Sequence, residues 1–178
     1  MTEPEFSRPI EVEALPNEIT EMEIEANEQE QAALAQRFSL LSLDSLKARL
    51  RLKKPENGGP VELDARITAK LTQTCVVTLE PVKNSIESAF SCIFAGEESE
   101  AVGTELDIDP DAADPPEPLV DGQFDAGELV AEYFGLEIDP FPRAPEADFD
   151  RETEGQNINK PEDASPFAAL RELSPEKK

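Results

Sequence analysis

Residues 46–53 read LKARLRLK, an unbroken alternation of apolar and basic side chains. Successive side chains of a strand point to opposite faces, so this period of two predicts a strand with one buried and one cationic face. The cationic face carries Lys47, Arg49, Arg51 and Lys53. The segment therefore predicts a sheet with one side on a core and the other side in water.

The next segment extends this pattern. An Asn57-Gly58-Gly59-Pro60 turn is followed by apolar residues on odd positions: Val61, Leu63, Ala65, Ile67, Ala69, Leu71, Cys75, Val77 and Leu79. Nineteen residues are too many for one flat strand, so we expect a bulge or bend between Thr72 and Cys75. A returning strand follows the Glu80-Pro81 turn. Its apolar residues take even positions: Val82, Ile86, Phe90, Cys92 and Phe94.

The N-terminal region predicts two short strands and a helix. The strands, over 6–13 and 19–25, should lie near a sheet edge, because Pro9 cannot donate a hydrogen bond to a central ladder. Asn27 and Glu30 have the spacing of a capping box, which predicts the start of a helix that ends between Phe38 and Leu41. The residues expected on its buried side are Ala32, Ala33, Leu34, Phe38 and Leu41.

A second helix is predicted to begin at Asp125, which is followed by Glu128, and to end before the proline-rich segment 139–145. Its apolar stripe consists of Leu129, Val130, Tyr133, Phe134 and Ile138. A stripe this wide should pack on the sheet. The fold class is therefore predicted to be α+β, with an antiparallel, strongly twisted sheet packed by two helices.

Charge is distributed unevenly along a chain whose net charge is -24. Residues 97–178 hold 24 acidic and 6 basic residues, whereas residues 37–83 hold 5 acidic and 9 basic residues. We expect one domain over 1–145 with an acidic, disordered loop over 97–118, in which Leu106–Asp109 could add a short strand. A flexible tail, 146–178, should end in a short amphipathic segment, 165–173. The candidate partner-docking residues of that segment are Phe167, Leu170 and Leu173.

Two cysteines and no histidine exclude several kinds of chemistry. A structural zinc site needs about four Cys or His ligands, and the common catalytic triads need a histidine. The chain has no phosphate-binding glycine loop, and the acids at 107, 109 and 111 lack the Gly and final Glu of an EF-hand. We therefore expect no catalytic residue, cofactor or metal, and expect two free, buried thiols in a reducing cytosol.

Neither a membrane span nor a secretory signal is evident in the sequence. No run of about twenty apolar residues could cross a bilayer. The N-terminus, MTEPEFSRP, lacks the basic and then apolar pattern of a signal peptide. These features predict a soluble, cytoplasmic protein.

Five motifs follow one another along the chain in a recognisable order. They are FSRPIEVEALP (6–16), QTCVVTLEPV (73–82), DPPEPL (114–119), DAGELVAEYFGLEIDPFPRAP (125–145) and SPFAALREL (165–173). In this order they resemble the YceD-type family, the large ribosomal RNA subunit accumulation proteins of bacteria and plastids, in the form common in alphaproteobacteria. The resemblance covers nearly the whole chain and is weakest over 97–118 and 146–164.

The resemblance implies a noncatalytic factor in the synthesis, processing or stability of large-subunit ribosomal RNA. Many relatives carry a C-x-x-C motif where this chain has Cys75 and Thr78, so a metal or redox role of such a pair does not transfer. The gene of the family commonly adjoins that of a small basic ribosomal protein. The resemblance thus supports a biogenesis factor rather than an enzyme.

Two partners remain open. Lys47, Arg49, Arg51 and Lys53 are the candidate RNA-binding residues, because strand geometry spaces their side chains by about 6.6 Å, within reach of neighbouring phosphates. Alternatively, they form an ordinary solvent face paired with acids of the N-terminal strands. The acidic half could instead make the protein a chaperone or interaction module for a small basic ribosomal protein, or simply keep it soluble. Precursor RNA, a pre-ribosomal particle and that protein are the candidate partners.

Overall fold

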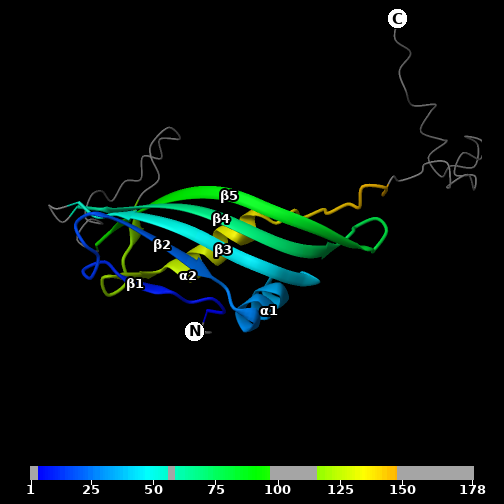
Figure 1. Cartoon of the computed structure of the whole chain (residues 1–178), viewed down its shortest axis with the longest axis horizontal. Helices are drawn as coiled ribbons and strands as arrows, with labels where there is room; N and C mark the ends of the chain where they lie inside the picture. The colour runs from blue at the N-terminus through cyan, green and yellow to red at the C-terminus, as the bar shows by residue number, and fades with distance from the viewer. Residues whose placement is uncertain (1–3, 56–58, 97–115, 148–178) are drawn as a thin grey trace, which may run out of the picture. The chain divides into compact units, whose positions relative to one another are not determined.

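A five-stranded sheet is the main element of the structure. It contains β2 (Ile19–Glu25), β3 (Ser42–Lys53), β4 (Val61–Thr74), β5 (Pro81–Ala95) and β6 (Glu117–Pro118), paired in that order. Figure 1 shows the four longer strands, β2 to β5, side by side. The structure is a computed structural model that describes residues 4–55, 59–96 and 116–147. Neighbouring strands are antiparallel, except that β5 and β6 are parallel. The sheet is therefore mixed, and mostly antiparallel as predicted.

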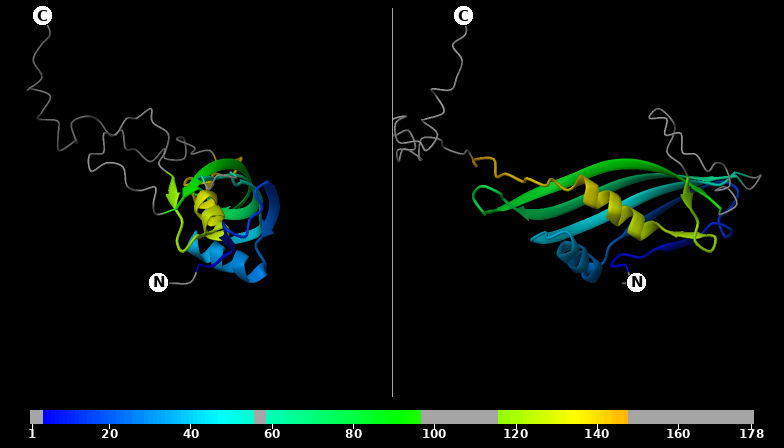
Figure 2. Two further views of the ribbon diagram at one scale, coloured as in Figure 1. Left: turned by 90° about the vertical axis from the view of Figure 1, so that its left-hand side faces the viewer. Right: turned by 180° about the vertical axis from the view of Figure 1, so that it is seen from behind.

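Both predicted helices are present and lie on the same side of the sheet. Figure 2 shows the sheet curving over α2 (Ala126–Glu137), with α1 (Glu28–Arg37) on the same concave side. The ring of Phe38, at the end of α1, meets the ring of Phe134 of α2 edge-on, with 5.5 Å between the centroids. The α+β class with two helices packed on a twisted sheet is thus confirmed.

The core between the sheet and the helices is built from complementary side chains. Between Leu46 and Leu50 of β3, each large inward residue faces a small one across β3 and β4, as Leu46 faces Ala69 and Leu50 faces Ala65. All four are buried, together with Val130 of α2. This alternation of sizes gives the sheet an even inner surface, on which a helix can pack at high density.

The first strand differs from the prediction. β1 (Pro9–Glu11) is shorter than 6–13, and it pairs with β7 (Gln123–Asp125) in a separate two-stranded sheet. The residues before β1 bind the start of α2 instead, because the amide of Arg8 donates to Asp125 Oδ1 at 2.7 Å and its carbonyl accepts from the Ala126 amide at 3.0 Å. The backbone of this segment is therefore unable to join the main sheet.

The capping box of α1 is confirmed, but part of its predicted buried face is wrong. Asn27 Oδ1 accepts from the amide of Glu30 at 3.0 Å, and the Glu30 carboxylate accepts from the amide of Asn27 at 2.7 Å. Ala32 is exposed, whereas Ala35 is buried beside Leu34. The helix ends at Arg37, so the chain leaves the helical path before Leu41, which is 57% exposed.

Of the bulge or bend predicted near Thr72 to Cys75, the bulge is absent, whereas the chain does change direction there, after β4 has ended at Thr74. β4 pairs with β5 in one unbroken register from Val61 to Thr74. The register shift lies in β3, between Leu43 and Ser45. After Thr74 the chain turns, and the Cys75 amide donates to the Glu80 carbonyl at 2.8 Å. Leu79 therefore lies in the turn, 76% exposed and with a φ of 62°, although it follows the apolar alternation of the strand.

The second helix begins at its N-cap Asp125, as predicted, and ends with Ile138 as C-cap. Its buried stripe includes Leu129, Val130 and Phe134. Residues 56–58, 97–115 and 148–178 lie outside the described part. The predicted Leu106–Asp109 strand and the 165–173 segment fall there, so the domain over 1–145 and its flexible tail stay predictions.

Candidate nucleic-acid interface

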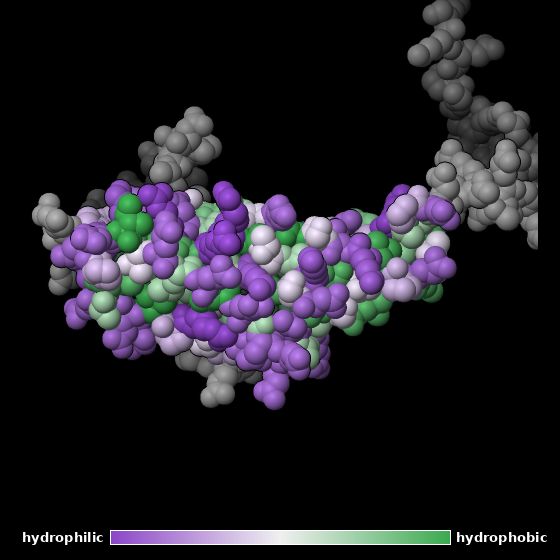
Figure 3. Space-filling model, in the orientation of Figure 1, coloured by the Kyte–Doolittle hydropathy of each residue, from purple (hydrophilic) through white to green (hydrophobic). Residues whose placement is uncertain are grey.

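The four predicted basic residues lie together on the outer face of the sheet, opposite the helices. The inward residues Leu46, Leu50 and Leu52 of β3 are at most 1% exposed, which confirms the alternation that directs the basic side chains outward. Figure 3 shows that most of this face is hydrophilic. Strand β3 is flanked there by the acidic strand β2 and by β4, which carries both signs of charge.

Three of the four basic residues are paired with carboxylates of neighbouring strands. Lys47 Nζ lies 2.9 Å from Glu25, Arg49 Nε lies 3.1 Å from Glu23, and Lys53 Nζ lies 3.0 Å from Glu62. For these residues the structure has the cross-strand pairing expected of an ordinary solvent face. Exposed pairs of this kind stabilise a fold by only about 0.2–1 kcal/mol each, so a competing anion could open them.

Arg51 and Arg66 lack such partners. Arg51 faces Asp64 across the strands, but neither arginine has an ion pair with any residue that the structure describes. Asp64 accepts a hydrogen bond from Ser91 Oγ at 2.9 Å. Arg66 lies directly opposite Arg49, and like charges in that position destabilise a sheet. This pair of facing guanidinium groups would gain from a bound anion.

Arg66 was not among the predicted residues, although the sequence contains a signal for it. The apolar residues of β4 hold odd positions, so its even positions, including Arg66 and Lys70, must face outward. Both are exposed in the structure. What the sequence alone did not supply was the register that sets Arg66 opposite Arg49.

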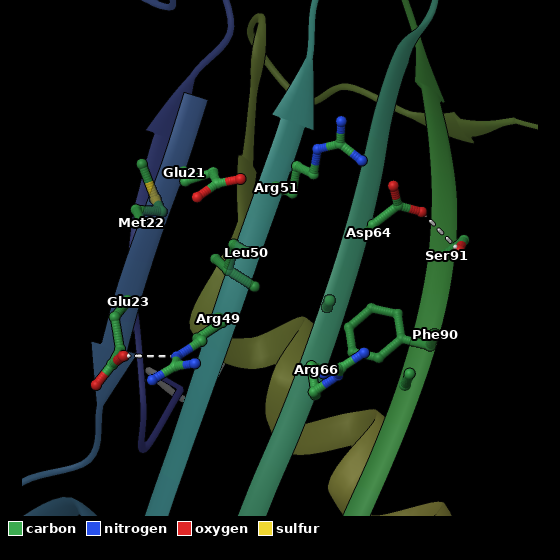
Figure 4. Close-up of a pocket in the computed structure, with 12 residues that line it drawn as sticks. Glu21, Met22, Glu23, Arg49, Leu50, Arg51, Asp64, Arg66, Phe90 and Ser91 are labelled. Atoms are coloured by element: carbon green, nitrogen blue, oxygen red, sulfur yellow. Dashed lines mark hydrogen bonds and ion pairs between the residues drawn. The ribbon is translucent and has the colours of Figure 1, made fainter. Parts of the chain in front are cut away.

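A groove of about 540 Å³ crosses the strands between two rows of outward side chains (Figure 4). Arg51 and Asp64 belong to one row, and Arg49 and Arg66 to the other. Planar guanidinium groups can hold phosphate oxygens with two parallel hydrogen bonds. Phe90, the aromatic residue of the lining, stacks on Tyr133 of α2 with 3.8 Å between centroids. The groove thus suits backbone phosphates better than stacked bases.

Cys75 forms a second distinctive site at the turn between β4 and β5. Its sulfur accepts hydrogen bonds from the amides of Val77 at 3.4 Å, Thr78 at 3.3 Å and Ala144 at 3.3 Å. The hydrogen bond with the Thr78 side chain, followed by those with the Thr78 and Ala144 amides, lowers the pKa of the Cys75 thiol to about 6. The hydrogen bond from the Ala144 amide to this buried sulfur fastens the segment before Pro145 to the turn.

The remaining features of Cys75 do not point to catalysis or metal binding. Both Cys75 and Cys92 are free and buried, as predicted. Thr78 occupies the position where a C-x-x-C motif has its second sulfur. Burial, the largest influence, raises the pKa of the Cys92 thiol. Within the described ranges, no three His, Cys, Asp or Glu side chains are grouped as metal ligands.

The described residues define a small α+β protein whose sheet presents a charged, grooved face to solvent. The family model for the large ribosomal RNA subunit accumulation protein YceD matches residues 63–174. The match spans more than half of the chain, so the protein belongs to the YceD family, and the predicted resemblance is confirmed. The family name links the protein to large-subunit ribosomal RNA accumulation and bacterial ribosome biogenesis.

No curated protein and no solved structure was found to match the chain. Among the described residues, neither helix is long and apolar enough to cross a bilayer.

Proposed function

We propose that this protein is a noncatalytic, cytoplasmic factor that supports the synthesis, processing or stability of large-subunit ribosomal RNA by binding precursor RNA or a pre-ribosomal particle. The outer face of the sheet is the proposed contact surface. The observation that carries the proposal is the pair Arg51 and Arg66, two guanidinium groups beside one groove without a carboxylate partner in the described part of the chain.

A phosphate placed between Arg49 and Arg66 would replace a repulsion by charge-assisted hydrogen bonds. The net charge of -24 opposes RNA binding at long range, but physiological salt screens charges beyond about 8 Å. The face itself is close to neutral. Its exposed or half-exposed charged residues on β2, β3 and β4 are the acids Glu21, Glu23, Glu25, Asp44, Glu62 and Asp64 and the bases Lys47, Arg49, Arg51, Lys53, Arg66 and Lys70.

The test compares two double variants that remove the same charge. Arg51→Gln with Arg66→Gln should weaken binding of a fluorescent large-subunit precursor transcript and lower the salt slope by about 1.4, at about 0.7 for each single-stranded phosphate contact. Lys83→Gln with Arg143→Gln, exposed positions outside the groove, should leave the slope unchanged. Equal losses would reduce the effect to net charge, and intact binding in the first variant would exclude this face.

An acidic interaction module for a small basic ribosomal protein is the second candidate function. It is supported by a second groove, on another part of the domain, whose lining contains four acidic residues and no basic residue. Phe167, Leu170 and Leu173 remain proposed docking residues for either partner. Affinity purification of the tagged protein with and without ribonuclease separates the two functions, because a directly bound ribosomal protein survives the treatment and one carried by RNA does not.

A further inference from the structure

The second groove lies where β1, β6, β7 and α2 meet, and it has a volume of about 380 Å³. Its floor is apolar and firmly packed. The rings of Phe94 and Phe124 stack with 4.2 Å between centroids, and Leu129 of α2 is buried beside them in the lining. Val120 belongs to the same lining but is 67% exposed, so the groove offers apolar surface to a ligand.

The four acidic residues of the lining differ in whether their carboxylates already have hydrogen-bond or ion-pair partners. Asp125 accepts hydrogen bonds from three amides and from the Ser7 hydroxyl, and Glu128 is paired with Arg37 at 2.9 Å. Glu117 and Glu132 are exposed and have no ion pair with a described residue. The carboxylates of Glu117 and Glu132 can therefore pair with cations of a ligand that also contacts the apolar surface of the groove.

The sequence adds charge of the same sign between β5 and β6, two strands that both contribute to the groove lining. Residues 97–115, which join β5 to β6 in the chain, contain eight acidic residues and no basic residue. A polyanion such as RNA would be repelled from these acids, whereas a cationic chain would be attracted. The complementary ligand thus carries both positive charge and aliphatic surface.

We propose that this groove binds an extended, lysine- or arginine-rich segment of a partner protein. The aliphatic stem of a lysine or arginine covers Val120, and its charged end reaches Glu117 or Glu132. This proposal rests on the second candidate function only in that the partner is a basic protein. Binding of a peptide can be measured without RNA or ribosomes, so it can fail while the biogenesis role stands.

The probe is a fluorescein-labelled decapeptide of alternating lysine and valine, titrated with the full chain by fluorescence anisotropy. Glu117→Gln with Glu132→Gln should weaken its binding roughly two- to thirtyfold, the range expected for two exposed ion pairs. Glu18→Gln with Glu87→Gln changes the charge equally at exposed positions outside the groove and should alter binding less than twofold. Val120→Ser should weaken binding of the lysine-valine peptide and of a lysine-serine peptide, because the stem of a lysine covers Val120 in both.

Each contrary result overturns the proposal. Equal losses in the two double variants would mean that only net charge attracts the peptide, and unchanged binding in the first would place the peptide elsewhere. If Val120→Ser does not change peptide binding, Val120 provides no apolar contact and the proposed site is wrong. If Glu117→Gln with Glu132→Gln weakens binding of a single-stranded RNA by the same factor as binding of the peptide, the groove is not a site for a basic protein segment. Circular dichroism checks that every variant remains folded.

Discussion

Gly127 gives the sharpest test of how the N-terminal segment is held. A Cβ atom at this position would lie 2.3 Å from the carbonyl oxygen of Phe6 and 3.0 Å from the amide nitrogen of Arg8. Both contacts are with backbone, which cannot rotate away as a side chain can. In a helix that met no such obstacle, replacing glycine by alanine would stabilise the protein by up to about 1 kcal/mol. The clash predicts the opposite sign.

The size of the effect follows from what must move. Displacing the segment breaks the hydrogen bonds from Arg8 to Asp125 and from Ala126 to Arg8, at about 1 kcal/mol each. Partial exposure of Phe6, now 0% exposed, costs about 1 kcal/mol more. After the helix-propensity gain of about 1 kcal/mol, Gly127→Ala should destabilise the protein by about 2 kcal/mol.

The assay is urea denaturation followed by circular dichroism, together with thermal unfolding, where a loss of about 2 kcal/mol corresponds to roughly 4–8 °C for a chain of this size. Gly96→Ala is the control, because nothing lies within 4 Å of a Cβ there, and it should change stability by less than about 0.5 kcal/mol. If Gly127→Ala is as stable as the natural chain, or more stable, the segment does not lie against α2 in this way and the reasoning is refuted.

Two further predictions concern pH. Burial, the largest influence, raises the pKa of Asp125, but hydrogen bonds from Arg8, Ser7 and the first turn of α2 outweigh it and hold this pKa below its usual range. The ionised Asp125 therefore stabilises the fold above the unfolded pKa of about 3.9, and this stabilisation is lost as pH falls through the lower pKa of the folded state. Asp125→Asn should consequently lose less urea resistance than the natural chain between pH 5 and pH 3. Cys75 has a lowered pKa of about 6, so its contribution should grow from pH 6 toward pH 9. The stability difference between the natural chain and Cys75→Ala should widen over that interval, and a constant difference would mean that the folded thiol does not ionise.

Local patterns in the sequence predicted the secondary structure where the same pattern also decided burial. The alternation around Leu50 gave the strand and its two faces, and Asn27 and Asp125 gave the starts of both helices. The alternation failed at Leu79, because turn hydrogen bonds end the strand although the apolar spacing continues. The predicted burial of Ala32 was wrong, because the helical period shows which residues share a face but not which face the sheet covers.

The pairing of strands that lie far apart in the chain could not be predicted from the sequence. The partner of β1 is β7, more than one hundred residues away, and no local pattern around Pro9 names it. The candidate site shows the same limit. The basic side chains of β3 were predicted, but their neutralisation by Glu23 and Glu25 depends on register, as does the opposition of Arg66 to Arg49. Charges can be read from a sequence, whereas their neighbours require the fold.

The attachment of the first residues to the second helix also sets an order of events during synthesis. Arg8 and Asp125 are 117 residues apart in the chain, so the ribosome must add about 117 residues before this contact can form. At about 5–20 residues per second, the wait lasts roughly 6–23 s. Throughout that time Phe6 has no binding site, and the inner surface of the sheet has no α2 to cover it. The nascent chain is therefore exposed to chaperones and to aggregation until its second helix has left the exit tunnel.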